Sequence, residues 1–328
     1  MKLSLIVPTF RSAATIERTL RSVLGQAHRP LEVIVYDETS QDGTREIVAR
    51  LLEESAGSGI ETRYSCSEEN SGPVKAWRVP LHQATGEWCC FVWADDVLEP
   101  SFSARMMEGA GRAVAAGRKL VFCSGTVEVD GRELTKYAAD AGILTPVEFS
   151  LGIFLRRYSL NQVNGIYETE AALRVFDRHV QFENPMGYDY NRFPYGNDAG
   201  FLSELAAEGG GVELIGERLV RLVLSGGSMT RDALASRLWQ MRWQYTFNQF
   251  RVWGWWRERG VPGASRLEAM AGRRLALCEL MLERGRRRRT VPGVGRALRA
   301  FADYLGWDHE RRPRSFEAYR HRVARLCA

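Results

Sequence analysis

Residues 88–96 read WCCFVWADD, six apolar residues followed by an alanine and two aspartates. A continuous apolar run of this length is typical of a strand covered on both faces, as in a parallel sheet. Two earlier runs are similar: residues 3–7, broken only by Ser4 and closed by Pro8, and residues 31–36, which contain Glu32 and are closed by Asp37. Because ligands bind at the carboxyl ends of such strands, the polar residues that follow each run are candidates for a site.

The segments between these runs carry the spacing of amphipathic helices. Apolar residues recur at three and four between Ala13 and Leu24, with Ser12 as the expected N-cap and Gly25 as the expected stop. The further expected helices are residues 44–52, Pro73–Ala84 and Pro100–Gly117, and the further expected strands are Glu61–Cys66 and Leu120–Cys123. This alternation predicts an α/β fold, Rossmann-like, with a mainly parallel sheet and helices on both faces.

Length, hydropathy and cysteine spacing exclude several classes of protein. The chain has 328 residues, 45% of them hydrophobic and 26% charged, which are ordinary globular values. No apolar run approaches the roughly 18–20 residues that span a bilayer, and the first eight residues indicate a buried strand, not a signal peptide. The six cysteines show no CxxC spacing, so we expect reduced thiols and a cytoplasmic protein.

Charge is distributed unevenly along the chain. Residues 1–215 hold 21 basic and 30 acidic side chains, whereas residues 216–328 hold 24 arginines and 10 acidic side chains. The acidic part is a poor candidate for nucleic-acid binding, and we expect no nucleic-acid partner. The basic part could face phosphates, anionic lipid or solvent.

The acid pair Asp95-Asp96 is the first chemical signal. No GxGxxG follows the first strand and no P-loop motif occurs, so a dinucleotide dehydrogenase and a P-loop NTPase are unsupported. Adjacent acids at a buried strand end are costly unless a cation compensates their charge. Divalent cations such as Mg²⁺ bind carboxylates together with substrate phosphates. Asp95 and Asp96 are therefore candidate metal ligands, with a solvated turn as the alternative.

Four stretches in this order resemble the family 2 inverting nucleotide-sugar glycosyltransferases. They are Pro8-Thr9-Phe10, YDETSQDGT (36–44), NSGPVKAWRVPLHQATGEW (70–88) and FVWADD (91–96). The resemblance covers about residues 2–230 and implies the A-type glycosyltransferase fold. It divides the chain into a catalytic domain, 1–230, and a helical Arg- and Trp-rich region, 231–328. Within the catalytic domain it implies a nucleotide-sugar-binding half, 1–125, and an acceptor half, 126–230.

The resemblance also implies roles for the residues that follow the strands. Asp37 falls on the acid that contacts the nucleotide base, and Glu38 on the second acid of that stretch. The turn that cradles the base and ribose is Pro8, Thr9 and Phe10. Asp95 and Asp96 fall on the motif that holds ribose, diphosphate and a divalent metal, Mg²⁺ or Mn²⁺. The chain departs from the pattern at Trp93, where many members have Asp or Asn.

Two cations and two acids complete the expected site. Lys75 or Arg78 could reach the donor diphosphate, with an exposed helix cation as the alternative for each. The resemblance places the catalytic base at Asp198, in Tyr195-Gly196-Asn197-Asp198, with Asp189 as runner-up. Asp198 is also a reasonable helix cap or first-turn acid. Residues 222–230, LVLSGGSMT, resemble a loop type without a metal-binding histidine, so no histidine ligand is expected.

The resemblance implies an inverting transferase that moves a sugar from a nucleoside-diphosphate sugar, for example a UDP-sugar, to a glycan or lipid-linked acceptor. Assembly of a surface polysaccharide or glycoconjugate is the expected setting. A non-catalytic sugar-nucleotide or glycan binding relative is the alternative, favoured by Trp93 and by Asn197. A nucleotidyltransferase is a third hypothesis, but residues 9–12 lack the glycines that its first loop needs.

The region after residue 231 has two interpretations. Five of the nine tryptophans fall within residues 239–256, and this segment is apolar over most of its girth. Such a helix is either packed beneath the catalytic domain or held against the inner face of a membrane, which would make the protein peripheral. The run Arg286–Arg289 with Arg284 is either a lipid-facing loop or a solvated surface.

Overall fold

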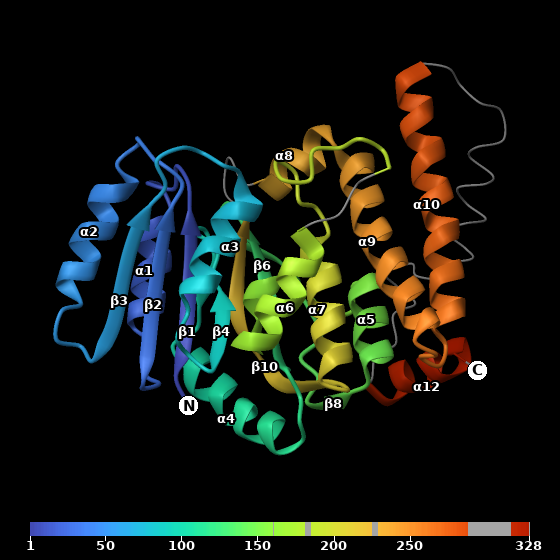
Figure 1. Ribbon diagram of the computed structural model, residues 1–328, viewed down its shortest axis with the longest axis horizontal. Coiled ribbons are helices and arrows are strands. Elements are labelled where there is room, and N and C mark those ends of the chain that lie inside the picture. The colour runs from blue at the N-terminus through green and yellow to red at the C-terminus, as the bar shows by residue number, and fades with distance from the viewer. Residues whose placement is uncertain (160, 181–184, 225–228, 288–315, 328) are drawn as a thin grey trace.

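The structure is a computed structural model that describes residues 1–159, 161–180, 185–224, 229–287 and 316–327. Its first 91 residues form a βαβ series (Figure 1). The strands are β1 (Leu3–Thr9), β2 (Leu31–Asp37), β3 (Ile60–Cys66) and β4 (Trp88–Phe91), and the helices are α1 (Ile16–Leu24), α2 (Thr44–Glu54) and α3 (Pro73–Gln83). The four strands are parallel, as predicted. Differences from the expected elements lie at their ends: the N-cap of α1 is Thr15, not Ser12, and α3 ends at Gln83.

The remaining strands make the sheet mixed, where a mainly parallel sheet was expected. They are β5 (Val97–Leu98), β6 (Leu120–Val129), β7 (Arg132–Lys136), β8 (Gly142–Leu144), β9 (Gly165–Glu168) and β10 (Val212–Leu224). The strand order is β3-β2-β1-β4-β9-β6-β10-β5, with β9 antiparallel to both of its neighbours. Asp130 and Gly131 join β6 to β7 with positive φ angles of 49° and 75°, the geometry of a two-residue hairpin turn. This turn takes the place of a helical crossover, so the chain reverses direction between β6 and β7.

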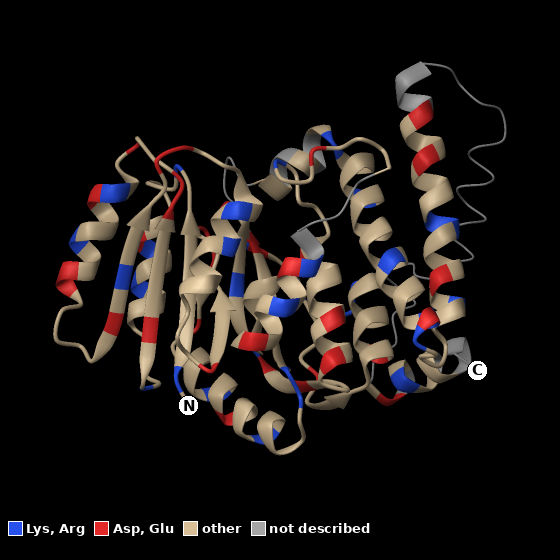
Figure 2. Cartoon of the chain, in the orientation of Figure 1, with Lys and Arg blue, Asp and Glu red and all other residues tan. Residues whose placement is uncertain are grey.

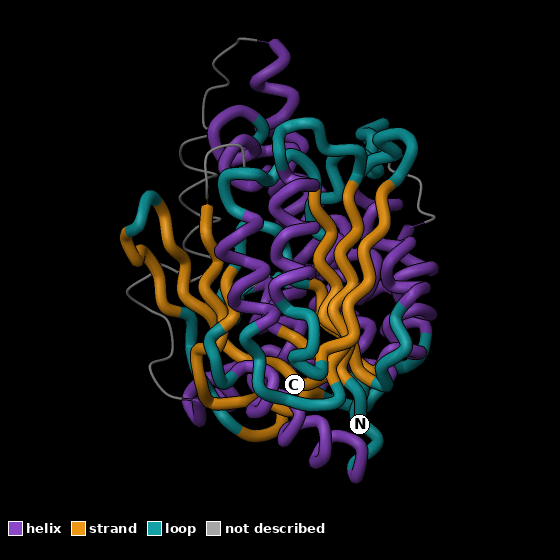
Figure 3. The backbone as a smooth tube through the Cα atoms, turned by 90° about the vertical axis from the view of Figure 1, so that its left-hand side faces the viewer, coloured by secondary structure: helices purple, strands orange, loops and turns teal. Residues whose placement is uncertain are grey.

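Helices cover both faces of this sheet (Figure 3). On one face α1, α2 and α4 (Phe102–Ala115) enclose a core with Leu3, Leu5 and Val7 of β1. On the other face lies a second core, to which Ile6 contributes. Its further elements are α3, α5 (Pro146–Phe154), α6 (Thr169–Val180) and α7 (Asn197–Glu208), and a 3₁₀ turn, η1 (Gln162–Asn164), precedes β9. The side chains of β1 enter these two cores alternately, and both cores are buried, which explains why its sequence is nearly all apolar.

The C-terminal helices extend the second core. They are α8 (Met229–Ser236), α9 (Leu238–Glu258), α10 (Ala264–Arg287) and α12 (Phe316–Cys327). Trp253 and Trp256 of α9 are fully buried, and their indole N–H groups donate to Ser150 Oγ at 2.8 Å and Glu204 Oε1 at 3.0 Å. Tyr319 of α12 donates to a backbone carbonyl of α5. The described helices after residue 229 therefore pack on the α/β unit.

The structure gives no support for the membrane interpretation of these helices. Trp243, Trp253 and Trp256 are each at most 1% exposed, so they face protein. Within the described ranges, no helix has the length and hydropathy needed to cross a bilayer. Figure 2 shows acidic and basic side chains interspersed along α10. Arg288 and Arg289 of the predicted basic run lie outside the described residues.

Candidate functional site

The carboxyl ends of β1, β2 and β4 open onto one cavity of about 820 Å³. Parallel strands end at the same edge of a sheet, so their following residues converge there. The cavity continues between the sheet and the helices α3, α5, α7, α9 and α10, which all contribute lining residues. Among the predicted site residues, those that line it are Pro8, Thr9, Phe10, Glu38, Asp95, Asp96 and Asp198.

Two acids at the end of β2 hold the loops beside this cavity in place. Asp37 is fully buried, and its Oδ1 accepts from the Ser40 backbone N–H at 3.1 Å and the Ser40 hydroxyl at 2.6 Å. Its Oδ2 accepts from Arg45 Nε at 3.1 Å. Glu38 accepts from the Ser71 N–H at 2.7 Å and hydroxyl at 3.0 Å. Asp37 thus fixes its own loop, and Glu38 ties that loop to the start of α3.

Thr9 supplies a polar atom with no partner in the described part of the chain. Its backbone carbonyl accepts from the Glu38 N–H at 2.9 Å, while its Oγ1 is buried without a hydrogen bond. A buried hydroxyl left unpaired costs on the order of 1–3 kcal/mol. A ligand that bonded Thr9 Oγ1 would recover that cost.

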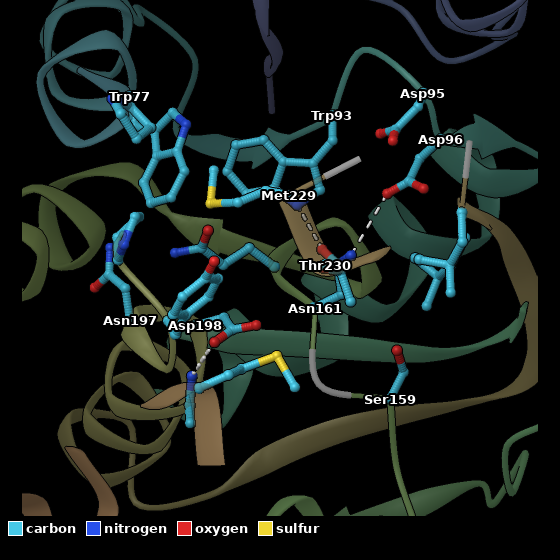
Figure 4. A pocket seen from close by; sticks show the side chains of 18 of the residues that line it. Trp77, Trp93, Asp95, Asp96, Ser159, Asn161, Asn197, Asp198, Met229 and Thr230 are labelled. Carbon is cyan, nitrogen blue, oxygen red and sulfur yellow. Dashed lines mark hydrogen bonds between the residues drawn. The ribbon is translucent and has the colours of Figure 1, made fainter. Parts of the chain in front are cut away.

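The acid pair lies in the loop after β4, at one side of the cavity (Figure 4). Asp96 is 3% exposed, and its Oδ1 accepts from the Val223 backbone N–H at 3.0 Å. Its Oδ2 lies 3.5 Å from the amide nitrogen of Asn161, whose oxygen accepts from the Trp93 indole at 2.6 Å. Burial, together with the charge of Asp95, raises the pKa of Asp96 well above its ordinary value.

These carboxyl groups suit a hard divalent cation. A buried acid beside a second acid retains its proton unless positive charge is brought close. Mg²⁺ typically takes one or two carboxylates and completes its shell with substrate phosphates and water. Within the described residues no three acidic, histidine or cysteine side chains cluster as a metal site. Asp95 and Asp96 therefore fit a cation that is shared with a bound phosphate.

Asp198 lies in the first turn of α7, at the opposite side of the cavity from the acid pair (Figure 4). Its Oδ1 accepts from the Ala199 N–H at 3.0 Å, and its Oδ2 lies 3.5 Å from the Tyr245 hydroxyl. Burial raises the pKa of Asp198 to about 7, against an ordinary value of 3.8. A carboxyl group with a pKa near neutrality is suited to accept a proton from a substrate.

Gly196 brings Tyr245 close to Asp198. It is the N-cap of α7, with a φ of 84°, so Asp198 is a first-turn residue and not the cap. A Cβ atom built on Gly196 would lie 2.6 Å from the Tyr245 Cα atom of α9, closer than two carbons can approach. The glycine therefore permits both the left-handed turn and the close contact with α9.

Besides Asp37, three predicted site residues are not among the described residues that line the cavity. Lys75 is exposed on α3, and Arg78 pairs with Asp177 of α6 at 2.7 Å. Asp189 is exposed, and its Oδ1 accepts from the Arg192 N–H at 3.0 Å. In the 222–230 loop, residues 225–228 lie outside the described residues.

Sequence reasoning missed two residues of the site, Asn161 and Tyr245. Asn161 links Trp93 to Asp96, and Tyr245 contacts Asp198 from α9. Tyr245 is part of the stripe at residues 242, 245 and 249, whose spacing places polar groups on one helical face. That polar spacing on a Trp-rich helix is the signal that would have found it.

The fold and this site define an A-type glycosyltransferase. Residues 4–167 match the family model described as "Glycosyl transferase family 2", and the chain belongs to that family. The chain is 31% identical over 195 residues to "Succinoglycan biosynthesis protein ExoO" of Rhizobium meliloti (strain 1021), with 53% of each chain covered. It spans between 32% and 53% of the length of the curated relatives that it matches first.

Solved structures of low sequence identity share the fold. The S. aureus TarS 1–349 complex with UDP-GlcNAc is similar at a TM-score of 0.52 and 17% identity, over 87% of this chain and 92% of that chain. The Pyrobaculum calidifontis mannosyltransferase PcManGT, in complex with GDP-Man and Mn²⁺, is similar at a TM-score of 0.50 and 17% identity. That match covers 99% of this chain and 83% of that chain.

Proposed function

We propose that the chain is an inverting glycosyltransferase that moves a sugar from a nucleoside-diphosphate sugar to an acceptor hydroxyl, in the assembly of a polysaccharide or glycoconjugate. One observation carries the proposal: a cavity has an acid pair at one side, of which Asp96 is buried, and an acid whose pKa is raised to about 7 at the other. The ExoO relative, named for succinoglycan biosynthesis, supports the polysaccharide setting. The donors in the TarS and PcManGT complexes support a UDP- or GDP-sugar.

We assign the donor to the side formed by the ends of β1, β2 and β4. Thr9 Oγ1, buried and unpaired among the described residues, would bond the nucleoside, and Glu38 lines the same wall. Asp37 would act there through the loop it fixes, because its carboxylate does not line the cavity. Asp95 and Asp96 would hold Mg²⁺ or Mn²⁺, which when bound neutralises charge on the leaving diphosphate.

Asp198 is proposed as the base. The acceptor oxygen would form a bond to the anomeric carbon as the bond from that carbon to the diphosphate oxygen breaks. The hydroxyl proton would pass to Asp198, and the nucleoside diphosphate would leave. Inversion requires attack from the face opposite the diphosphate, which agrees with Asp198 lying across the cavity from Asp95 and Asp96.

The boundary of the catalytic unit follows from this assignment. We propose residues 1–230 as the catalytic domain and 231–328 as a helical region that completes its acceptor side, because Tyr245 of α9 contacts Asp198. A peripheral location at the inner face of a membrane, with a lipid-linked or glycan acceptor, stays a prediction.

The proposal is tested by incubating the full chain with a panel of UDP-, GDP- and dTDP-sugars, with Mn²⁺ or with EDTA. Slow release of free nucleoside diphosphate from one donor, abolished by EDTA, is the expected result. Donor binding without any turnover under all conditions would instead indicate a non-catalytic binding relative.

A further inference from the structure

Three arginines from different elements line the cavity that also holds Asp198. Arg156 directly follows Leu155, the C-cap of α5, Arg242 lies on α9 and Arg274 lies on α10. Arg242 is three residues from Tyr245, so the two side chains share one face of α9. Tyr245 in turn contacts Asp198 at 3.5 Å.

Within the described part of the chain, the three guanidinium groups are not paired with acids. Among these residues no carboxylate lies within 4.0 Å of Arg156, Arg242 or Arg274, whereas Arg157 pairs with Asp140 at 2.7 Å and Arg320 with Glu148 at 2.7 Å. Arg274 instead donates to the backbone carbonyl of Phe154 at 3.4 Å. Its guanidinium carbon lies 4.6 Å from the centre of the Phe154 ring.

Arg242 and Arg274 are partly buried, whereas Arg156 is exposed. Burial, together with the positive charges of Arg156 and Arg242, lowers the pKa of Arg274 to about 10. Burial also lowers the pKa of Arg242, again with a contribution from Arg156. Partly buried cations that repel one another are costly unless an anion compensates them. Guanidinium groups present planar N–H forks that match the oxygens of a phosphate.

We propose that Arg156, Arg242 and Arg274 bind a phosphate group of the acceptor, so that the acceptor is a phosphate-bearing glycan or carrier. This inference rests on the proposed function, which places the donor diphosphate at Asp95 and Asp96, across the cavity. The arginines line the same cavity as the proposed base, and Arg242 shares a face of α9 with Tyr245, which contacts Asp198. The same chemistry occurs in the diphosphate of a lipid carrier and in the phosphodiesters of a polymer.

The test measures binding of inorganic pyrophosphate to the full chain by calorimetry, with EDTA present so that the acid pair holds no metal. Each of Arg156→Gln, Arg242→Gln and Arg274→Gln should weaken the affinity at least about tenfold, because a charge-assisted hydrogen bond contributes about 1.5–3 kcal/mol. Arg274→Lys, which keeps the charge but loses the fork, should fall between wild type and Arg274→Gln. Arg266→Gln, on an exposed part of the same helix, should bind like wild type.

Two further probes separate the sources of the phosphate. Farnesyl diphosphate represents a lipid carrier, and a glycerol-phosphate oligomer represents a polymer. The probe with the higher affinity identifies the source, and its affinity should fall in the triple glutamine variant. Unchanged affinity for pyrophosphate and both probes in that variant, with wild-type circular dichroism, would overturn the inference.

Donor hydrolysis by the wild-type chain keeps the two proposals distinguishable. Suppose that the wild-type chain hydrolyses a donor in a metal-dependent way, but the arginine variants bind pyrophosphate as tightly as wild type. The proposed function would then stand, and the phosphate site would be excluded. If the arginine variants lose pyrophosphate affinity but the wild-type chain hydrolyses no donor, the phosphate site would stand and the proposed function would be excluded.

Discussion

Replacement of Asp198 by asparagine separates catalysis from folding. Asparagine has nearly the same shape and keeps an oxygen that can accept from the Ala199 N–H. It cannot take the acceptor proton at neutral pH, and a positioned base typically contributes about 10²–10⁴ in rate. We therefore expect transfer to fall by about two to four orders of magnitude with donor affinity nearly unchanged.

The same substitution should not destabilise the protein at neutral pH. Folding raises the pKa of Asp198 from 3.8 to about 7, so between these values the folded state binds more protons than the unfolded state. Stability then decreases as pH rises through this window, by on the order of 4 kcal/mol at about 1.4 kcal/mol for each pH unit. The substituted amide has no charge to bury, so Asp198→Asn should melt at the same or a higher temperature at pH 7.5.

The assay follows nucleoside diphosphate release with donor and acceptor across pH 5–9, with thermal melts at each pH. Wild-type transfer should rise with pH through about 7, because the ionised form of Asp198 is the active one. Asp189→Asn is the matched control, since Asp189 is exposed and is not among the described lining residues. Near-wild-type transfer by Asp198→Asn, or a large loss in Asp189→Asn, would refute the assignment of the base.

Four further substitutions test the metal site, the nucleotide site and the packing of α9. Asp95→Ala and Asp96→Ala should each weaken Mn²⁺-dependent nucleotide binding in calorimetry, and wild-type affinity in both would remove the metal assignment. Asp37→Ala should weaken nucleotide binding with and without metal, because it releases the Ser40 hydroxyl that shapes the loop; unchanged affinity would exclude Asp37 from the site. Trp253→Ala should cost about 3–5 kcal/mol in chemical denaturation, because Trp253 is fully buried, and a loss below about 1 kcal/mol would place α9 outside the core.

The part of the fold before residue 92 was predictable because its strands are covered on both faces. The short apolar runs at residues 3–7 and 31–36 favour buried parallel strands, and β1 and β2 are found there. The strand β9 was not predicted, since its four residues are too few for a period and its direction depends on two neighbours distant in sequence.

The site divides in the same way. Asp95 and Asp96 follow a strand whose end the sequence marks, so their place at the cavity could be predicted. Asp198 was reached through the family resemblance, because a carboxylate that opens an apolar helix has no distinctive spacing of its own. Arg156, Arg242 and Arg274 belong to segments up to 118 residues apart, and only their packing in three dimensions brings them together.

The most direct test of the central claim is a crystal structure of the full chain with Mn²⁺ and the nucleoside diphosphate of its donor. We expect an anomalous manganese peak beside Asp95 and Asp96, from an ion that also contacts the diphosphate, and an open volume in front of Asp198. A diphosphate bound instead by Arg156, Arg242 and Arg274, with no manganese at the acid pair, would contradict it.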